Sequence, residues 1–280
     1  MNILDTLKKA TNILKNHKIK TPYIDSEILL SELMNIDKKY IILNPKQNVT
    51  KKFQDAFYRL IERRKKGEPI AYLTNKKEFW KHVFYVDRNV LIPRPDTETI
   101  VEQILKIYSK ESKLQILDIG TGSGCILLTL LKERANFNGT GIDISSKCIK
   151  VSKYNAKMLD LTNRVRFYNS DVDNFRIGKY DVVVSNPPYI EPACLKYLDK
   201  EVSGFEPSLA LNGGFDGFSK IRKVIKNAAV LIKKNGKLFL EIGFDQKIKV
   251  IEILKNEGFY INKIIKDYGN NDRCIISTKI

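Results

Sequence analysis

Residues 1–66 carry apolar side chains at helical spacing. The first helix places five of them on one expected face, namely Ile3, Leu4, Leu7, Ile13 and Leu14. Thr21 and Pro22 provide a cap and a first-turn proline for a second helix, with Ile28, Leu29 and Leu33 directed inward. A third helix begins at Thr50, with an apolar stripe that includes Phe53 and Phe57, and stops at the basic run RRKKG. This pattern predicts a small all-helical domain.

From about residue 67 the pattern changes to β-like alternation. The stretch up to residue 98 holds three prolines and the only tryptophan, Trp80. We interpret it as a hairpin-like connector followed by a helix near 97–109. The expected division is therefore a helical, partner-binding domain over 1–75, a connector over 76–95 and a larger domain over 96–280.

The rest of the chain alternates strand-like and helical segments. Strands are expected at 115–120, 139–144, 165–171, 180–185 and 236–243, and helical stretches separate most of them. This alternation predicts a parallel sheet covered on both faces. The last two strand-like segments, 260–267 and 273–280, are joined by so short a turn that they must be antiparallel. A mostly parallel sheet with one reversed strand differs from a plain dinucleotide-binding fold and is typical of class I methyltransferases.

Composition excludes several classes of site. Apolar residues make up 43% of the chain, yet the longest apolar runs, such as AAVLI at 228–232, fall far short of the roughly 20 residues of a membrane span. The amphipathic N-terminus lacks the apolar stretch of a secretory signal. Four scattered cysteines without a CxxC pair favour reduced thiols in a cytoplasmic protein. With only two histidines, we expect neither a histidine triad nor a metal site.

The net charge of +17 is open to two interpretations. It could help the protein approach an RNA-like or ribonucleoprotein partner. It could equally reflect a general preference for lysine, because the lysines are spread along the chain without a dense basic block. The charge alone does not separate the two.

A glycine-rich turn lies where the first strand of the sheet meets a helix. The segment 118–124 reads DIGTGSG, with glycines at Gly120, Gly122 and Gly124. Glycines let the backbone pass close to a ligand, and the helix N-terminus offers free N–H groups. A ligand site is the favoured interpretation over an empty tight turn, although several classes of nucleotide-binding protein use such a loop.

Two acidic residues follow the next two strands. Asp143 is placed to accept hydrogen bonds from a ribose diol. Its alternative role is to cap the helix at 146–158, which Ser145 could do instead. Asp171 is a candidate to hold an adenine amino group, and capping a turn is an equally open role for it.

The fourth strand ends in the sequence Asn-Pro-Pro-Tyr, residues 186–189. The Asn186 side-chain carbonyl and the rigidly held Pro187 main-chain carbonyl can accept hydrogen bonds from one NH₂ group. Two such acceptors fix a planar amide or amine and favour localisation of its lone pair toward a methyl donor, without a metal or a nucleophilic side chain. Tyr189 can pack on the flat substrate or near a sulfonium. A plain turn is the alternative.

Motifs from one end of the chain to the other resemble the release factor glutamine methyltransferases, the HemK/PrmC family. They are GEPIAYL (67–73), EFW (78–80), LIPRPDTE (91–98), DIGTGSG (118–124), SNPPYI (185–190), FEPSLAL (205–211), GGFDG (213–217), LEIGFDQ (240–246) and KDYGNNDR (266–273). The resemblance implies an α/β class I methyltransferase domain, with a Rossmann-like, seven-stranded, mostly parallel sheet that has one antiparallel strand. A small helical domain and a β-hairpin would precede it.

The resemblance also implies a reaction: methyl transfer from S-adenosylmethionine to the side-chain amide nitrogen (N5) of glutamine in the Gly-Gly-Gln motif of peptide chain release factors, which modulates translation termination. Motif matching assigns cofactor binding to Gly120, Thr121, Gly122, Ser123, Gly124, Asp143, Asp171, Val172 and Asn186. It assigns substrate binding to Asn186, Pro187, Pro188 and Tyr189, of which Asn186, Pro187 and Tyr189 are the catalytic candidates.

One position departs from the family's pattern, and the roles of two others stay open. Val172 stands where some members carry an aromatic residue, and it can cover an adenine ring by apolar contact. Arg94 and Glu98 would lie near the rim of the active site, where a purely structural role is equally open.

Rival functions fit the sequence less well. A DNA or RNA exocyclic-amine N-methyltransferase shares the NPPY motif, but a base-flipping enzyme usually needs a target-recognition region, and here the extra region is only residues 1–75. A vestigial RNA- or ribosome-binding module conflicts with the intact glycine loop, Asp143 and NPPY. A dehydrogenase would have no use for the terminal hairpin or NPPY. We therefore expect a protein substrate, no direct nucleic-acid substrate, no membrane association and a monomer.

Overall fold

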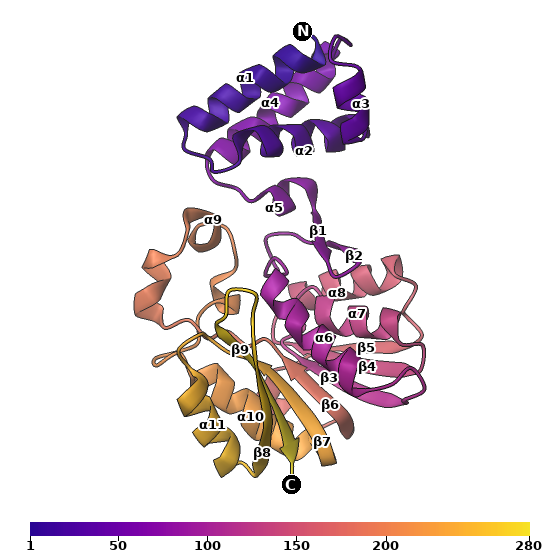
Figure 1. The fold of residues 1–280 in the computed structure, drawn as a ribbon, viewed down its shortest axis with the longest axis vertical. Coiled ribbons are helices and arrows are strands. Elements are labelled where there is room, and N and C mark those ends of the chain that lie inside the picture. Colours follow the sequence, from indigo (N-terminus) through magenta and orange to yellow (C-terminus); the bar gives the residue numbers. More distant parts are fainter. The chain divides into compact units, whose positions relative to one another are not determined.

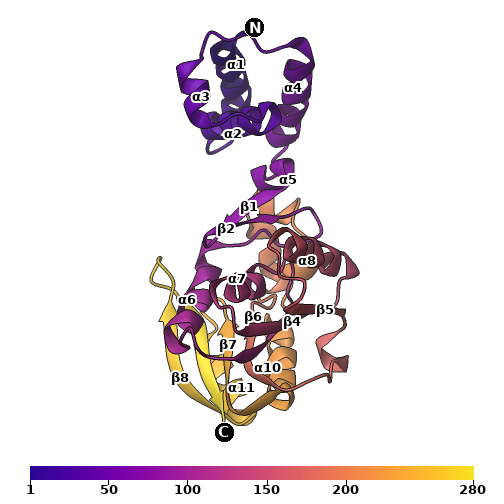
Figure 2. The ribbon, with the colours of Figure 1, turned by 90° about the vertical axis from the view of Figure 1, so that its right-hand side faces the viewer.

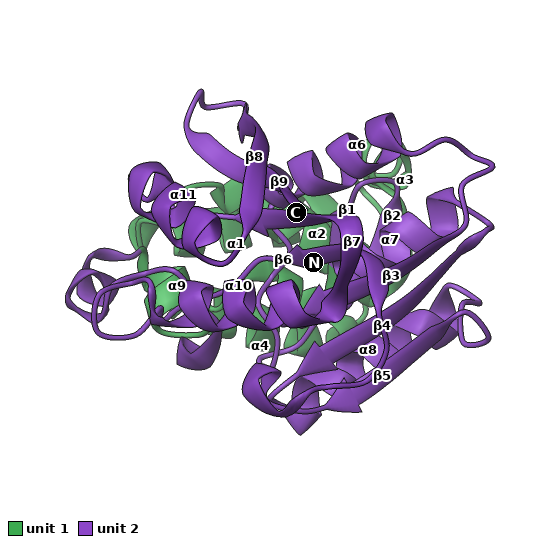
Figure 3. Ribbon diagram, turned by 90° about the horizontal axis from the view of Figure 1, so that it is seen from below, with its two compact units in different colours: residues 1–76, 199–205 green, residues 77–198, 206–280 purple.

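The computed structural model describes residues 1–280, which form two compact units (Figure 3). Unit 1 comprises residues 1–76 and a distant segment, 199–205. Unit 2 comprises residues 77–198 and 206–280. Unit 2 is therefore interrupted in sequence by seven residues that belong to unit 1.

Unit 1 is all-helical, as the sequence predicts. Its helices are α1 (Ile3–Asn16), α2 (Pro22–Met34), α3 (Lys38–Leu43), α4 (Lys51–Lys65), α5 (Ile70–Thr74) and α9 (Lys200–Ser203) (Figure 1). A core that includes Ile3, Leu7, Leu29 and Phe57 joins the longer ones. Three residues expected to face inward are instead among the exposed apolar side chains: Leu4, Ile28 and Phe53. Leu4 and Ile28 each adjoin a buried residue, and one helical step turns a side chain about 100° away from its neighbour.

A buried arginine fixes the distant segment in unit 1. The Arg64 side chain is only 4% exposed and donates to the Asp25 carboxylate at 2.7 Å and to the Glu201 carboxylate at 2.6 Å. Lys20 donates to Asp199 at 2.8 Å on the surface of the same unit. A buried guanidinium needs such partners. These pairs join residues far apart in sequence, and the pattern of the sequence did not reveal them.

Unit 2 is built on one twisted sheet (Figure 2). Its strand order is β5-β4-β3-β6-β7-β9-β8, and all seven strands are labelled in Figure 1. The strands are β3 (Leu114–Ile119), β4 (Phe137–Asp143), β5 (Val165–Asn169), β6 (Tyr180–Ser185), β7 (Ile232–Glu241), β8 (Phe259–Lys266) and β9 (Asp272–Lys279). All pair in parallel except β9, which is antiparallel to both β7 and β8. The predicted fold class is confirmed, including the single reversed strand.

Helices cover both faces of this sheet. One face packs against α6 (Glu98–Ile107), α7 (Cys125–Glu133) and α8 (Ser146–Met158), and the other against α10 (Ser219–Leu231) and α11 (Lys247–Asn256). In β6, Val182 and Val184 belong to the first layer and Val183 to the second. A strand buried on both faces needs apolar residues at every position, which explains its VVV run.

A β-hairpin precedes α6. Its strands are β1 (Lys76–Phe79) and β2 (His82–Tyr85), and the rings of Phe79 and Phe84 contact each other in the core of unit 2 with centroids 6.2 Å apart. The Glu98 carboxylate accepts a hydrogen bond from the Trp80 backbone N–H at 2.6 Å. Glu98 therefore holds the hairpin turn.

Short 3-10 helices shape the loops of unit 2: η1 (Pro95–Thr97), η2 (Val172–Asn174), η3 (Pro192–Tyr197) and η4 (Ser208–Ala210). No helix in the chain has both the length and the apolar character to cross a membrane.

Candidate functional site

A cavity of about 200 Å³ opens at the carboxyl edge of the sheet in unit 2, beyond the ends of β3, β4 and β6. Ligands of open α/β sheets bind at this edge. Most of the residues singled out from the sequence line it: Gly120, Gly122, Asp143, Asp171, Val172, Asn186, Pro187 and Pro188. The structure thus brings the glycine loop, both acidic residues and the Asn-Pro-Pro segment to one place.

The glycine loop presents bare backbone to the cavity. Gly120 and Gly122 have φ angles of +75° and +55°, and a Cβ added at Gly120 would meet no atom within 4 Å. Gly124 has a different role, because a Cβ there would lie 3.0 Å from Leu128 Cδ1 in α7. The first two glycines therefore leave space for a ligand, and the third lets the helix pack closely.

Two other loop residues point away from the cavity. The Thr121 hydroxyl donates to the Asp118 carboxylate at 2.8 Å, and both side chains are buried. Ser123 is also buried, and its carbonyl accepts a hydrogen bond from Asn155 at 2.9 Å. Of the five loop positions assigned to cofactor binding, only Gly120 and Gly122 line the cavity. Thr121 and Ser123 hold the glycine loop in place through contacts on the side away from the cavity.

Asp143 ends β4 with its carboxylate at the cavity. Oδ2 accepts from the Gly122 N–H at 3.0 Å and Oδ1 from the Ser145 N–H at 2.9 Å. Burial raises the pKa of Asp143, and the two N–H donors oppose that rise. Each carboxylate oxygen can accept a second hydrogen bond, so capacity remains for a ligand's hydroxyl groups. Ser145, whose hydroxyl accepts from the Cys148 N–H at 3.3 Å, caps the following helix.

Asp171 caps a turn, which is one of its two expected roles, and it also lies at the cavity. Its Oδ1 accepts from the Asp173 N–H at 3.0 Å and so caps η2, while the residue also lines the cavity beside Val172. The second carboxylate oxygen carries no hydrogen bond from the chain. It is free to meet a ligand.

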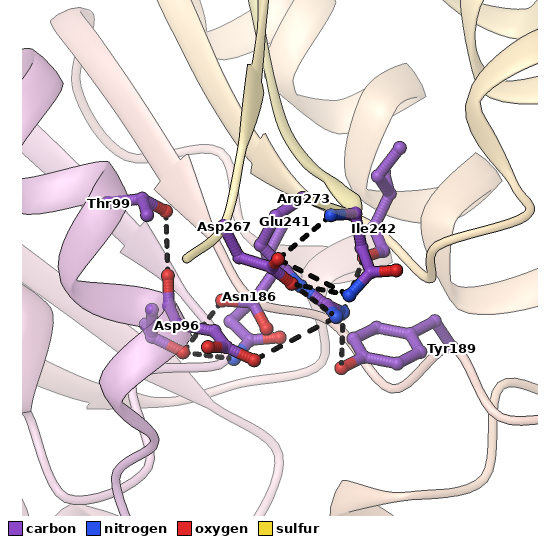
Figure 4. A network of polar contacts seen from close by, with 10 residues as sticks. Asp96, Thr99, Asn186, Tyr189, Glu241, Ile242, Asp267 and Arg273 are labelled. Carbon is purple, nitrogen blue, oxygen red and sulfur yellow. Dashed lines mark hydrogen bonds and ion pairs between the residues drawn. The ribbon is translucent and has the colours of Figure 1, made fainter. Parts of the chain in front are cut away.

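Asn186 follows β6 and turns one side of its amide away from the cavity. Its Nδ2 donates to the Thr97 hydroxyl at 3.2 Å (Figure 4). Neither Asn186 Oδ1 nor the Pro187 carbonyl oxygen receives a hydrogen bond from the chain. Two adjacent residues that line the cavity therefore each have a carbonyl oxygen without a partner in the chain.

Tyr189 lies behind this turn, outside the lining of the cavity. Its phenol oxygen accepts from Arg273 Nη1 at 3.4 Å (Figure 4). Its main-chain carbonyl accepts from Gln246 Nε2 at 3.0 Å. Burial raises the pKa of the phenol to about 12. In this structure Tyr189 anchors the turn.

The backbone just after Tyr189 packs closely against the backbone of the loop around Gly213. Ile190 forms an isolated bridge with Asn212, and the Gly213 N–H donates to the Ile190 carbonyl at 2.8 Å. A Cβ added at Gly213 would lie 2.8 Å from the carbonyl carbon of Tyr189. The GGFDG motif therefore allows one loop to lie against another.

Sequence reasoning missed part of the cavity. Leu91 lies within the LIPRPDTE motif, and Pro207, Leu209 and Ala210 lie within FEPSLAL; all four line the cavity. Arg94 joins the two motifs, because its Nη2 donates to Glu206 Oε1 at 2.5 Å. Both motifs resemble those of the family, and their shared place in the lining of the cavity gives them a physical role. Arg94 ties two lining segments together.

Comparison with known proteins identifies two families along the chain. Residues 5–74 match the family described as PrmC N-terminal domain, and residues 110–272 match a methyltransferase domain. No group of three or more His, Cys, Asp or Glu side chains is arranged to hold a metal ion.

Curated relatives match along the whole length of this chain or nearly so. The chain is 39% identical to the release factor glutamine methyltransferase of Buchnera aphidicola from Schizaphis graminum, covering 100% of both chains. It is 35% identical to that of Caulobacter vibrioides, covering 96% of this chain and 94% of the relative. It is also 34% identical to the bifunctional methyltransferase of Rickettsia conorii, but spans only 58% of that longer protein.

Solved structures show the same fold. A methyltransferase from Pyrococcus furiosus superposes with a TM-score of 0.53 at 19% identity, over 70% of this chain and 88% of its own. The ribosomal protein L11 methylase of Lactobacillus delbrueckii gives a TM-score of 0.51 at 18% identity, over 70% of this chain and 84% of its own. With several of its motifs contributing residues to one cavity and relatives matching along its whole length, the chain belongs to the release factor glutamine methyltransferase family.

Proposed function

We propose that this protein transfers a methyl group from S-adenosylmethionine to the side-chain amide nitrogen (N5) of the glutamine in the Gly-Gly-Gln motif of peptide chain release factors. The substrate class comes from the names of the full-length relatives. The observation that carries the proposal is a single cavity lined by the glycine loop and Asp143 together with Asn186 and Pro187, whose two carbonyl oxygens receive no hydrogen bond from the chain.

The residues around the glycine loop fit the cofactor. Bare backbone at Gly120 and Gly122 leaves room for a ligand, and the spare lone pairs of Asp143 suit the two ribose hydroxyls. Asp171 can accept from the adenine amino group through its free oxygen, and Val172 can cover the ring. When bound, S-adenosylmethionine supplies an activated methyl group, whose transfer to the amide nitrogen leaves S-adenosylhomocysteine and releases one proton to water.

Asn186 and Pro187 would hold the substrate amide. An amide NH₂ group has two N–H donors, and the two unoccupied oxygens can accept one each. The two hydrogen bonds together fix the plane of the substrate amide and the orientation of its NH₂ group. This favours a conformation in which the nitrogen lone pair points at the methyl donor. Pro188 and Tyr189 would keep this turn rigid. The chain thus contributes alignment and preorganised acceptors.

We further propose that the protein acts as a monomer in the cytoplasm, with a helical domain (residues 1–75) that binds the release factor. Residues 76–95 would be the connector and residues 96–280 the methyltransferase domain. Four free cysteines suit a reducing compartment. The relatives used for this proposal are bacterial proteins named as release factor methyltransferases.

The direct test incubates the purified protein with labelled S-adenosylmethionine and a release factor, and locates the label by mass spectrometry. We expect one methyl group on the Gly-Gly-Gln peptide, and none on a factor whose motif glutamine is replaced by alanine. A parallel reaction with DNA and RNA tests the rival amine methyltransferase. Label in nucleic acid, with none in the release factor, would contradict the proposal.

A further inference from the structure

A chain of hydrogen bonds runs from the Asn186 amide into the protein interior. Asn186 Nδ2 donates to Thr97 Oγ1 at 3.2 Å, and the Thr97 hydroxyl donates to Glu241 Oε2 at 2.7 Å (Figure 4). Thr97 is 3% exposed and Glu241 is 2% exposed. The three residues come from the end of β6, from η1 and from the end of β7. None of this connection follows from the NPPY motif alone.

The hydroxyl of Thr97 determines which way the amide faces. An ionised Glu241 carboxylate can only accept, so the single proton of the hydroxyl is directed to it. The Thr97 oxygen is then left as an acceptor, and the Asn186 group that faces it must be the NH₂. The oxygen and the nitrogen of an amide are bonded to the same carbon and point in different directions within one plane, so Oδ1 faces away from Thr97.

A set of charges surrounds Glu241. Arg273 favours its ionised form and is itself held by Asp267, which accepts from Nη2 at 2.9 Å, and by the Ile242 carbonyl at 3.1 Å (Figure 4). The other titratable or charged groups that interact with Glu241 are Arg94, Asp96, Tyr189, Cys125 and Cys274. Burial raises the pKa of Tyr189 and of Cys125 to about 12 and also raises the pKa of Cys274, so none of these three titrates near neutral pH.

We propose that Glu241 and Thr97 are positioning residues for methyl transfer, which turn the Asn186 amide so that its oxygen, and not its NH₂, meets the substrate. The inference rests on the proposed function, because it concerns how that same acceptor is presented to the glutamine. Neither residue lines the cavity, so both act through Asn186.

Glu241, once protonated, would no longer fix which group donates and which accepts in the hydrogen bonds from Asn186 through Thr97 to Glu241. A neutral carboxyl group can donate to Thr97, whose own proton is then available to Asn186 Oδ1, and the amide can turn over. Its NH₂ would then meet the NH₂ of the substrate, and two donors do not bond. Burial raises the pKa of Glu241 to about 7. The active form is the deprotonated one, so turnover is expected to fall as the pH drops through about 7.

A second group titrates in the same range. Burial also raises the pKa of Asp118, beneath the glycine loop, to about 7. The Asp118 carboxylate accepts from Thr121 in the glycine loop, so its protonation would affect the part of the cavity proposed to bind the cofactor. Measurements at saturating cofactor, together with a variant in which Glu241 cannot ionise, separate the two groups.

The experiment compares Thr97→Val with Thr97→Ser and with a matched control, Thr99→Val. Thr99 is buried two residues away, and its hydroxyl donates to the Asp96 carbonyl without contacting Asn186. We expect Thr97→Val to lower kcat for release factor methylation by about 10²-fold, because the reacting amide loses its fixed orientation. Cofactor affinity, measured by calorimetry, should stay unchanged. Thr97→Ser should restore most of kcat, and Thr99→Val should behave as wild type.

The pH profile gives the second readout. At saturating cofactor the wild-type kcat should fall below about pH 7, whereas Glu241→Gln should show a lower kcat without that fall. A Thr97→Val protein with wild-type kcat, a Thr97→Ser protein as impaired as Thr97→Val, or an unchanged acid limb in Glu241→Gln would overturn the inference. A wild-type protein that methylates no release factor would overturn the proposed function, and the inference with it.

Discussion

The two sides of the cavity are built in different ways. On the cofactor side, Gly120, Gly122 and Asp143 lie within 24 residues of one another, and main-chain N–H groups hold the carboxylate in place. On the substrate side, Asn186 depends on Thr97, which is 89 residues away in sequence, and through it on Glu241. The cofactor side is formed by strand ends and turns that are close in sequence, whereas the substrate side is assembled from segments that are distant in sequence.

This difference separates binding from turnover. A change on the cofactor side removes contacts that exist whether or not a substrate is present, so affinity for the cofactor should fall. A change on the substrate side alters the direction of one amide acceptor, so the cofactor should still bind while the reaction slows. Variants on the two sides should therefore show opposite kinetic patterns.

The largest effect is expected from Asn186→Ala. It removes one of the two acceptors for the substrate amide, and loss of a preorganised group at a reacting centre lowers turnover by about 10²- to 10³-fold. The affinity for S-adenosylmethionine, measured by calorimetry, should remain close to that of the wild type. If cofactor binding and methylation disappear together, Asn186 belongs to the cofactor side and the comparison fails.

Asp143→Ala should give the reverse pattern. It removes the acceptors for the ribose and leaves the N–H groups of Gly122 and Ser145 without their partner. A cost of about 1–3 kcal/mol corresponds to a Kd for the cofactor raised by roughly 5- to 150-fold. At saturating cofactor, kcat should recover. A variant that lost kcat with an unchanged Kd would contradict the assignment of Asp143.

Gln246→Ala tests the support of the Asn-Pro-Pro-Tyr turn. The Gln246 side chain donates to the carbonyls of Tyr189 and Gly217 and accepts from the Gly243 N–H, and it is 6% exposed. Its loss should lower the free energy of unfolding by about 1–3 kcal/mol, with kcat reduced more than cofactor affinity. Thermal denaturation and steady-state kinetics on one preparation measure both. An equal loss of kcat and affinity would show that Gln246 supports both sides of the cavity.

Val172→Ala should have the smallest effect. It deletes two methyl groups at the proposed adenine site, and the lost apolar contact is worth about 1 kcal/mol, or roughly a fivefold rise in cofactor Kd. Val172→Phe is the matched variant, because an aromatic side chain can cover the same ring with more surface. If the alanine variant binds the cofactor as tightly as the wild type, Val172 does not contact it.

Patterns within short segments predicted much of this molecule. The alternation of strands and helices led to the correct sheet, and the short YGNN turn led to the antiparallel pair of β8 and β9. The glycine loop and Asp143 were placed at the cavity for a similar reason, since a strand end and its following turn are local features.

Side chains whose roles depend on distant partners could not be placed in this way. The segment 199–205 joins unit 1 through Arg64 and Lys20, although it lies between strands of the sheet in sequence. Tyr189 was expected against the substrate, and the structure turns its phenol to Arg273. Glu241 ends an apolar strand, and only the three-dimensional arrangement shows that it is linked to Asn186 through Thr97.

Methylation of a release factor by wild-type and Asn186→Ala proteins side by side, each with its cofactor affinity measured, tests the central claim most directly. The account predicts one methyl group on the Gly-Gly-Gln glutamine with the wild type, and almost none with the variant at the same cofactor affinity. Wild-type protein that leaves this glutamine unmodified, or a variant that methylates it as well as the wild type, would contradict the account.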